Sequence, residues 1–372
     1  MSDLFPIRFF LGANSPQGFV SRFDQLDCSD PYWHTFIIKG GPGCGKSSLM
    51  KKIVQTFQPL SPAMEVIACS SDPDSLDAVI LPEWKVSIAD GTSPHLLEPK
   101  YPALNDTLIS LGDALSPERL VLRCEELHFL RSTIQENYRH AIDCFSAAKS
   151  FLTDSTRLAL GSLDLRKLNA YAESFAAKHL PRQVLTDIPP RENARFLSTL
   201  CGQGIVSLYD TVKSLCSKIY FIEDDYSSAA PILLSSLKNL AVKNNYSVIS
   251  CYCPLSPLKK IDHLLIPQAG IALMTQNHFH DLSSLSPERT IHLRRFQCND
   301  QLLRYKKRLA FNRKAACQML TSGCNLLGEN KALHDRMERI YLSAMDFSCM
   351  EQLEEKITQQ ILERKDLGIL ES

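Results

Sequence analysis

Residues 40–47 carry the clearest chemical signal in the sequence, because they read Gly-Gly-Pro-Gly-Cys-Gly-Lys-Ser and match the pattern G-x-x-x-x-G-K-S. Glycines let successive backbone N–H groups turn toward phosphate oxygens without a Cβ clash. Lys46 is long enough to reach the β- and γ-phosphates of a nucleotide, and Ser47 can offer its hydroxyl to Mg²⁺. The residues expected to contact the nucleotide are Gly40, Gly41, Pro42, Gly43, Cys44, Gly45, Lys46, Ser47 and Ser48.

The segments on either side of this loop are those that a phosphate-binding loop needs. Residues 36–38 form an apolar run with strand character, and residues 48–54 have the pattern of an amphipathic helix. The N-terminus of such a helix adds a partial positive charge at the loop. We therefore interpret residues 40–47 as a phosphate-binding loop, in preference to a chance glycine-rich turn.

Two aspartates are the candidates for the remaining chemistry. Asp90 ends the predicted strand 84–89, and an acid at the end of an apolar strand can hold Mg²⁺ beside the loop. Gly91 follows it, where many motor-type ATPases have a water-activating Glu, so the catalytic base stays unassigned. Asp72, at the end of the predicted strand 64–69, is a candidate base; the alternative is a turn or helix-cap residue before Pro73. The predicted catalytic set is Lys46, Asp72 and Asp90, and the predicted metal ligands are Ser47 and Asp90.

The chain contains the same unit twice. Several segments of the first half recur in the second half at a steady offset of 184–186 residues. A steady offset over several segments indicates a duplicated domain. Asp77 corresponds to Asp262 and His95 to His280, and features that both halves share are interpreted as structural.

The second copy has lost the residues that would bind phosphate. In the same register residues 40–47 become residues 224–231, Asp-Asp-Tyr-Ser-Ser-Ala-Ala-Pro. Ala230 stands in the place of Lys46, and the acidic pair Asp224 and Asp225 should repel phosphate. The sequence therefore predicts one working loop and one degenerate loop.

Two long segments have helical periodicity. Residues 116–180 and 300–367 carry apolar stripes at i, i+3, i+4 and i+7 spacing with no Pro in their cores. The predicted fold is α/β: tandem P-loop NTPase domains, each a parallel sheet flanked by helices and followed by a helical hairpin. The predicted boundaries are 1–115 for the active domain, 116–190 for the first arm and linker, 191–290 for the degenerate domain and 291–372 for the second arm.

Composition limits the kinds of partner and the cellular location that we expect for this protein. The chain has 372 residues, 41 basic and 41 acidic, so bulk charge does not favour a nucleic-acid partner, although a local basic patch on the second arm leaves one open. Thirteen scattered cysteines without a C-x-x-C pair are typical of free thiols in a reducing compartment. With no signal peptide pattern and no apolar run long enough for a membrane span, we expect a cytoplasmic protein.

The strings at residues 40–50, 69–77 and 90–95 resemble a group of bacterial tandem P-loop ATPase-like proteins, mainly from Firmicutes. The resemblance extends over essentially the whole chain. It implies tandem P-loop domains and ATP binding, and it implies no pathway. In that family the second half often looks like a working domain too, whereas residues 224–231 of this chain depart from the pattern.

Three functions follow as hypotheses. The first is a Mg²⁺-dependent ATPase in which the active half moves against the degenerate half, which could supply a basic group such as Arg195 to the active site. The second is a nucleotide-gated binding module with negligible turnover that recruits a protein partner through its helical arms. The third is a small-molecule kinase. ATP is favoured over GTP because no N/T-K-x-D guanine motif is present.

Overall fold

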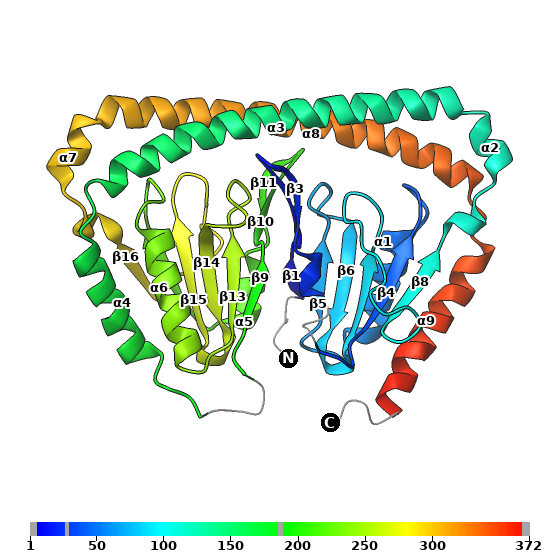
Figure 1. The fold of residues 1–372 in the computed structure, drawn as a ribbon, viewed down its shortest axis with the longest axis horizontal. Coiled ribbons are helices and arrows are strands. Elements are labelled where there is room, and N and C mark those ends of the chain that lie inside the picture. The colour runs from blue at the N-terminus through cyan, green and yellow to red at the C-terminus, as the bar shows by residue number, and fades with distance from the viewer. Residues whose placement is uncertain (1–5, 27–29, 185–188, 367–372) are drawn as a thin grey trace.

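We describe the protein from a computed structural model, in which residues 6–26, 30–184 and 189–366 are placed. The chain forms two α/β units side by side, each with one six-stranded sheet flanked by helices (Figure 1). The first sheet has the order β1-β5-β6-β7-β4-β8. Its strands are β1 (Ile7–Phe9), β4 (His34–Lys39), β5 (Glu65–Ala68), β6 (Leu76–Leu81), β7 (Val86–Asp90) and β8 (Asp106–Ser110).

The second sheet repeats the first. Its order is β9-β13-β14-β15-β12-β16, so both sheets have the same order when strands are counted from the start of each unit. Its strands are β9 (Glu192–Arg195), β12 (Lys218–Glu223), β13 (Val248–Tyr252), β14 (Ile261–Ile266), β15 (Ile271–Gln276) and β16 (Arg289–His292).

Both sheets are mixed, which corrects the prediction of parallel sheets. In the first sheet β6 runs antiparallel to β5 and β7, and in the second β14 runs antiparallel to β13 and β15. The reason is the length of the connections. Only residues 69–75 join β5 to β6, and only residues 82–85 join β6 to β7. Neither connection is long enough for the crossover of about a dozen residues that parallel neighbours require.

The two units share a core. A β-hairpin follows the first strand of each unit, β2 (Gly12–Ser15) with β3 (Gly18–Ser21) and β10 (Ser198–Cys201) with β11 (Gly204–Ser207). Just before the hairpins, Phe10 and Phe196 exchange two backbone hydrogen bonds of 2.9 Å. Buried apolar side chains of both sheets form one cluster that includes Phe9, Ile67, Phe221 and Met274. The units therefore pack as one body along this seam.

Two long helices span both units. α3 (Cys124–Leu160) and α8 (Lys306–Ala344) run antiparallel to each other across one end of the two sheets (Figure 1). Their contact is apolar and includes Ala141 and Phe145 of α3 with Ala316, Leu320 and Cys324 of α8. The stripes recognised in the sequence thus pair one half with the other.

The helix after each long helix covers the opposite unit. α4 (Leu165–His179) packs on α6 (Ala230–Lys243) of the second unit, and α9 (Ser348–Asp366) packs on α1 (Lys46–Phe57) of the first. The prediction that each helical segment folds as a hairpin on itself is therefore wrong. The two helices of a segment diverge, because the apolar faces of α4 and α9 pack into the apolar clusters of the second and the first unit, respectively.

The remaining elements are short connections. They are α2 (Pro117–Val121), α5 (Asp210–Leu215), α7 (Asn299–Arg304), and the 3₁₀ helices η1 (Phe23–Gln25), η2 (Pro82–Trp84), η3 (Gly112–Ala114), η4 (Pro267–Ala269) and η5 (Leu293–Phe296). α2 and β9 begin close to the predicted boundaries at 115/116 and 190/191, whereas β16 spans the predicted boundary at 290/291.

Two properties bear on the class of protein. Within the placed residues, every helix is too short or too polar to cross a bilayer. The eleven cysteines whose side chains are described are all free thiols. The side chains of the other two cysteines, Cys28 and Cys349, are not among those described.

Candidate functional site

The glycine-rich loop is the six-residue connection, residues 40–45, between the inner strand β4 and helix α1. Two of its residues have left-handed backbone conformations, Gly43 with φ +72° and Gly45 with φ +83°. Side chains other than glycine are strained there. Gly45 is also the N-cap of α1, so the open N–H groups of the helix face the loop. The loop thus has the backbone that an anion cradle requires.

Lys46 holds its ammonium group over this loop. Its Nζ donates hydrogen bonds to the carbonyl oxygens of Gly40 at 2.7 Å and Gly41 at 2.8 Å. The same atom lies 3.6 Å from Oδ2 of Asp90. The structure therefore brings together Lys46 and Asp90, two residues that the sequence assigned to one site.

Asp90 ends β7, directly beside β4, where Ile38 pairs with it. Its Oδ1 accepts hydrogen bonds from the backbone N–H and the hydroxyl of Thr92. Nearby, Oγ of Ser47 accepts a hydrogen bond from the N–H of Leu76 at 3.0 Å. Strand pairing and these bonds fix the positions of both predicted metal ligands.

The oxygen ligands in this site fit Mg²⁺, which prefers hydroxyl and carboxylate oxygens. Ser47 and Asp90 supply one of each kind. Phosphate oxygens and water molecules usually complete its coordination. Among the described residues there is no group of three or more His, Cys, Asp or Glu that could hold a metal alone. Magnesium at this site would therefore be bound together with a phosphate ligand.

Packing explains why a glycine follows Asp90. A Cβ at Gly91 would lie 2.5 Å from Cγ2 of Ile37 and 3.1 Å from the carbonyl oxygen of Leu97. Real Cβ atoms do not approach side chains and backbone this closely. This crowding excludes a glutamate at position 91, so the position cannot supply a water-activating acid.

Asp72 is not aimed at the loop. Its carboxylate accepts a hydrogen bond from Oγ of Ser75 at 3.0 Å, and its backbone carbonyl accepts one from the N–H of Ser75. Nζ of Lys331, on α8, lies 3.3 Å from the same carboxylate. Among the described residues no polar contact joins Asp72 to Lys46 or Asp90. This is the turn geometry that was the alternative interpretation of Asp72.

Arg195 is also unavailable to the site. Its side chain is buried, 2% exposed, and its Nε donates to Glu65 of the first sheet at 2.9 Å. It holds the seam between the units and does not reach into the glycine-rich loop. A basic residue of the second half that does approach the strand ends of the first unit is Lys331.

Residues of the second half lie against the outer surface of the loop. A Cβ at Gly41 would be 2.9 Å from the ring of Tyr341, and one at Gly43 would be 2.8 Å from the carbonyl oxygen of Glu338. Both neighbours belong to α8, and sequence periodicity gave no sign of this contact. The glycines of the loop are thus needed for close packing as well as for backbone conformation.

A buried carboxylate–imidazole pair lies near the loop and was assigned only a structural role from the sequence. Nε2 of His95 is 3.2 Å from Oδ2 of Asp77. Burial disfavours the imidazolium, but the carboxylates of Asp77 and Asp90 outweigh it, and the pKa of His95 is raised. The second unit has the same pair, His280 and Asp262, also at 3.2 Å. A pair that persists where the loop is degenerate supports the structural role.

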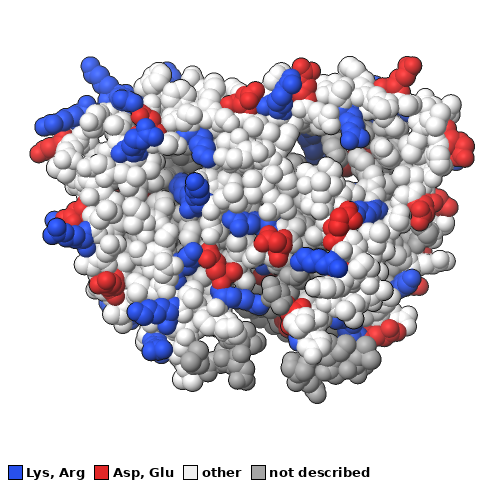
Figure 2. Space-filling view, in the orientation of Figure 1, with Lys and Arg blue, Asp and Glu red and all other residues white. Residues whose placement is uncertain are grey.

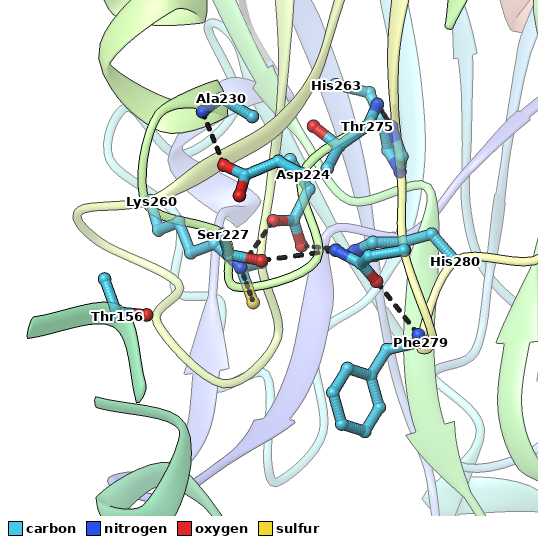
Figure 3. A network of polar contacts seen from close by, with 12 residues as sticks. Thr156, Asp224, Ser227, Ala230, Lys260, His263, Thr275, Phe279 and His280 are labelled. Carbon is cyan, nitrogen blue, oxygen red and sulfur yellow. Dashed lines mark hydrogen bonds and ion pairs between the residues drawn. The ribbon is translucent and has the colours of Figure 1, made fainter. Parts of the chain in front are cut away.

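The corresponding loop of the second unit, residues 224–229, has the same length but contains its own anion. The carboxylate of Asp224 accepts hydrogen bonds from the N–H groups of Ala229 and Ala230 at 2.8 Å and of Tyr226 at 3.3 Å. Figure 3 shows the bond from Ala230. Burial raises the pKa of Asp224 in spite of these donors. Ser227 keeps the left-handed conformation of Gly43, with φ +50°. The N-terminus of α6 is thus capped by a side chain of its own loop.

A scan against protein-family models found no match, and the searches of curated proteins and of solved structures found none either. The function of the site therefore has to be argued from its own geometry.

Proposed function

We propose that the chain binds ATP with Mg²⁺ at residues 40–48 and hydrolyses it. The observation that supports this most strongly is the arrangement of one loop. Gly43 and Gly45 have left-handed backbones, α1 starts directly behind them, and the ammonium of Lys46 lies over the loop, 3.6 Å from Asp90. These are the parts that phosphoryl chemistry on a nucleotide needs.

Each part has a distinct role in this proposal. Backbone N–H groups of the loop and of the first turn of α1 hold the phosphate oxygens. Lys46 leaves the carbonyl oxygens of Gly40 and Gly41 and pairs with the β- and γ-phosphates. Ser47 and Asp90 hold Mg²⁺, which supplies charge neutralisation at the phosphates when it is bound. Cys44 is not a nucleophile here, because burial raises the pKa of its thiol.

The degenerate half serves as a docking partner for the active half. Asp224 already fills the anion cradle at the start of α6, so this loop has no place for a phosphate. In contrast, α8 of the second half touches Gly41 and Gly43 of the active loop. In this proposal a nucleotide in the loop changes the position of α8, and the helical arms carry that change to a protein partner.

A second candidate is a nucleotide-gated sensor with negligible turnover. Two observations favour it over a fast ATPase. The fold excludes a side chain at Gly91, and the carboxylate of Asp72 is engaged by Ser75 and Lys331. Neither position then supplies a general base. The kinase hypothesis has no comparable observation in its favour.

The experiment is ATP binding and Mg²⁺-dependent ATP hydrolysis by the full chain and by two lysine variants. Lys46→Ala should lower the affinity for ATP by roughly 10- to 100-fold, the effect of one charge-assisted contact, and should abolish turnover. Lys51→Ala, on the exposed side of α1, is the matched control and should behave like the wild type. Tight binding without turnover in the wild type would select the sensor. Equal binding by wild type and Lys46→Ala would refute both candidates.

A further inference from the structure

A sizeable cavity lies in the second unit, and residues 40–48 do not line it. Its volume is about 580 Å³, within the range of sites for small organic ligands. The loop 225–228 and the ends of β13 and β15 form its floor, and α3 and α8 form its roof. It therefore occupies the position in the second unit that corresponds to the nucleotide site in the first.

The wall of this cavity is mostly apolar. Its apolar side chains come from both long helices, the hairpin and the strand-end loops. They include Leu152, Leu200, Leu255, Phe279, Leu309 and Leu320. A nucleotide is a poor match for such a wall, and Asp224 already occupies the phosphate cradle next to it. The cavity suits a ligand with an apolar body.

The acidic side chains that line the cavity are paired with cations, whereas several of its basic side chains are not paired with acids. Its two acids are already paired, because Lys260 lies 2.9 Å from Asp262 and Arg294 pairs with Asp225. The fully buried Asp262 also lies 3.2 Å from Nε2 of His280. Figure 3 shows Lys260 and His280 pointing toward each other within this polar network. The acids therefore do not neutralise any further cation.

Three cations that line the cavity are left without an acidic partner among the described residues, namely Lys149, Lys306 and Arg313. They come from α3 and α8, and Figure 2 shows Lys and Arg side chains gathered at the corner of the molecule where α8 begins. Unpaired cations beside an apolar chamber are complementary to an amphipathic anion.

We propose that this cavity binds a small amphipathic carboxylate, with its hydrocarbon body in the chamber and its carboxylate on Arg313, Lys306 and Lys149. A carboxylate fits better than a phosphate, because the phosphate cradle beside the cavity already holds the carboxylate of Asp224. Arginine can hold a carboxylate through two parallel hydrogen bonds. The degenerate half thus keeps a ligand site in which the phosphate cradle has been replaced by an internal carboxylate.

Calorimetric titration of the full chain with decanoate tests this site, with decanol and decylamine as neutral and cationic analogues of the same length. We expect saturable one-to-one binding of decanoate and at least tenfold weaker binding of both analogues. Arg313→Glu should weaken decanoate binding by at least tenfold. Lys314→Glu, next to it on α8 but outside the cavity lining, should leave it unchanged.

A second variant separates the cavity from surface charge. Ala310 lines the cavity, and Ala310→Trp should fill part of it and reduce decanoate binding without changing the net charge. The proposal is overturned if decanoate shows no saturable binding, if decanol binds equally well, or if Arg313→Glu and Lys314→Glu have equal effects. Because ATP binding is measured separately, either result can stand without the other.

Discussion

Replacing Asp224 should uncover an anion site at the start of α6. In the wild type Asp224 is 4% exposed, and its carboxylate accepts three backbone hydrogen bonds, two of them 2.8 Å long. Asp224→Ala leaves the N–H groups of Ala229 and Ala230 buried without a partner. Asp225→Ala is the matched control, because Asp225 is exposed and, among the residues that the structure places, its ion pair is with Arg294 at the surface.

The structure gives the size of the effect. A buried donor left without its partner costs about 1–3 kcal/mol, so two such donors cost about 2–6 kcal/mol. Part of this is offset, because burial disfavours the charged form of Asp224 and the variant no longer buries it. We therefore expect Asp224→Ala to lower the free energy of unfolding by about 2–4 kcal/mol. Asp225→Ala, which breaks an exposed ion pair, should cost less than about 1 kcal/mol.

Urea denaturation followed by far-UV circular dichroism measures both variants. Sulfate then provides the specific test, because a free cradle at the N-terminus of α6 should bind it. Sulfate also stabilises proteins in general, and Asp225→Ala corrects for that effect. We expect sulfate to restore more stability to Asp224→Ala than to the control. The reasoning is refuted if both variants lose equal stability, or if sulfate stabilises them equally.

Three further predictions concern packing, the seam and pH. Gly43→Ala should increase the rate of amide hydrogen exchange at residues 338–341 of α8, because the added Cβ meets Glu338. Gly204→Ala is the control, because Gly204 also has a positive φ but has open space around it. Equal exchange rates in the two variants would contradict the contact. Arg195→Met should lower the free energy of unfolding by about 2–4 kcal/mol, because it leaves Glu65, whose side chain is 13% exposed, without its buried partner. A loss of turnover at unchanged stability would instead indicate a catalytic role. Burial lowers the pKa of His263 to about 3, and His280 adds to the shift. Below a pH of about 6.5 the unfolded chain therefore binds a proton that the folded protein does not. The free energy of unfolding should fall as the pH drops from 6.5 toward 3. His263→Gln should flatten that slope in urea titrations, and an unchanged slope would rule this residue out as its source.

Local patterns were sufficient to predict the strand–loop–helix geometry of residues 36–54 and to find the corresponding loop of the second unit. Gly43, Gly45, Lys46 and Asp90 lie together because a strand–loop–helix connection and a neighbouring strand end fix them within a short stretch of chain. The same local reasoning found the repeat, and both sheets do have the same strand order.

Long-range packing decided the features that were wrong or missed. An apolar stripe on a helix does not name its partner, so the crossing of α4 and α9 to the opposite unit could not be read from periodicity. The close packing of Tyr341 on Gly41 and the pairing of Asp72 with Lys331 join residues that are hundreds of positions apart. The strand directions, in contrast, could have been predicted from the sequence. The short connections on either side of β6 indicate antiparallel neighbours.

The most direct test of one working nucleotide site in a duplicated chain is the stoichiometry of ATP binding with Mg²⁺, measured by titration calorimetry. The account predicts one ATP per chain, lost in Lys46→Ala and retained in Asp225→Ala. Two ATP molecules per chain, or one that Lys46→Ala still binds with wild-type affinity, would contradict it.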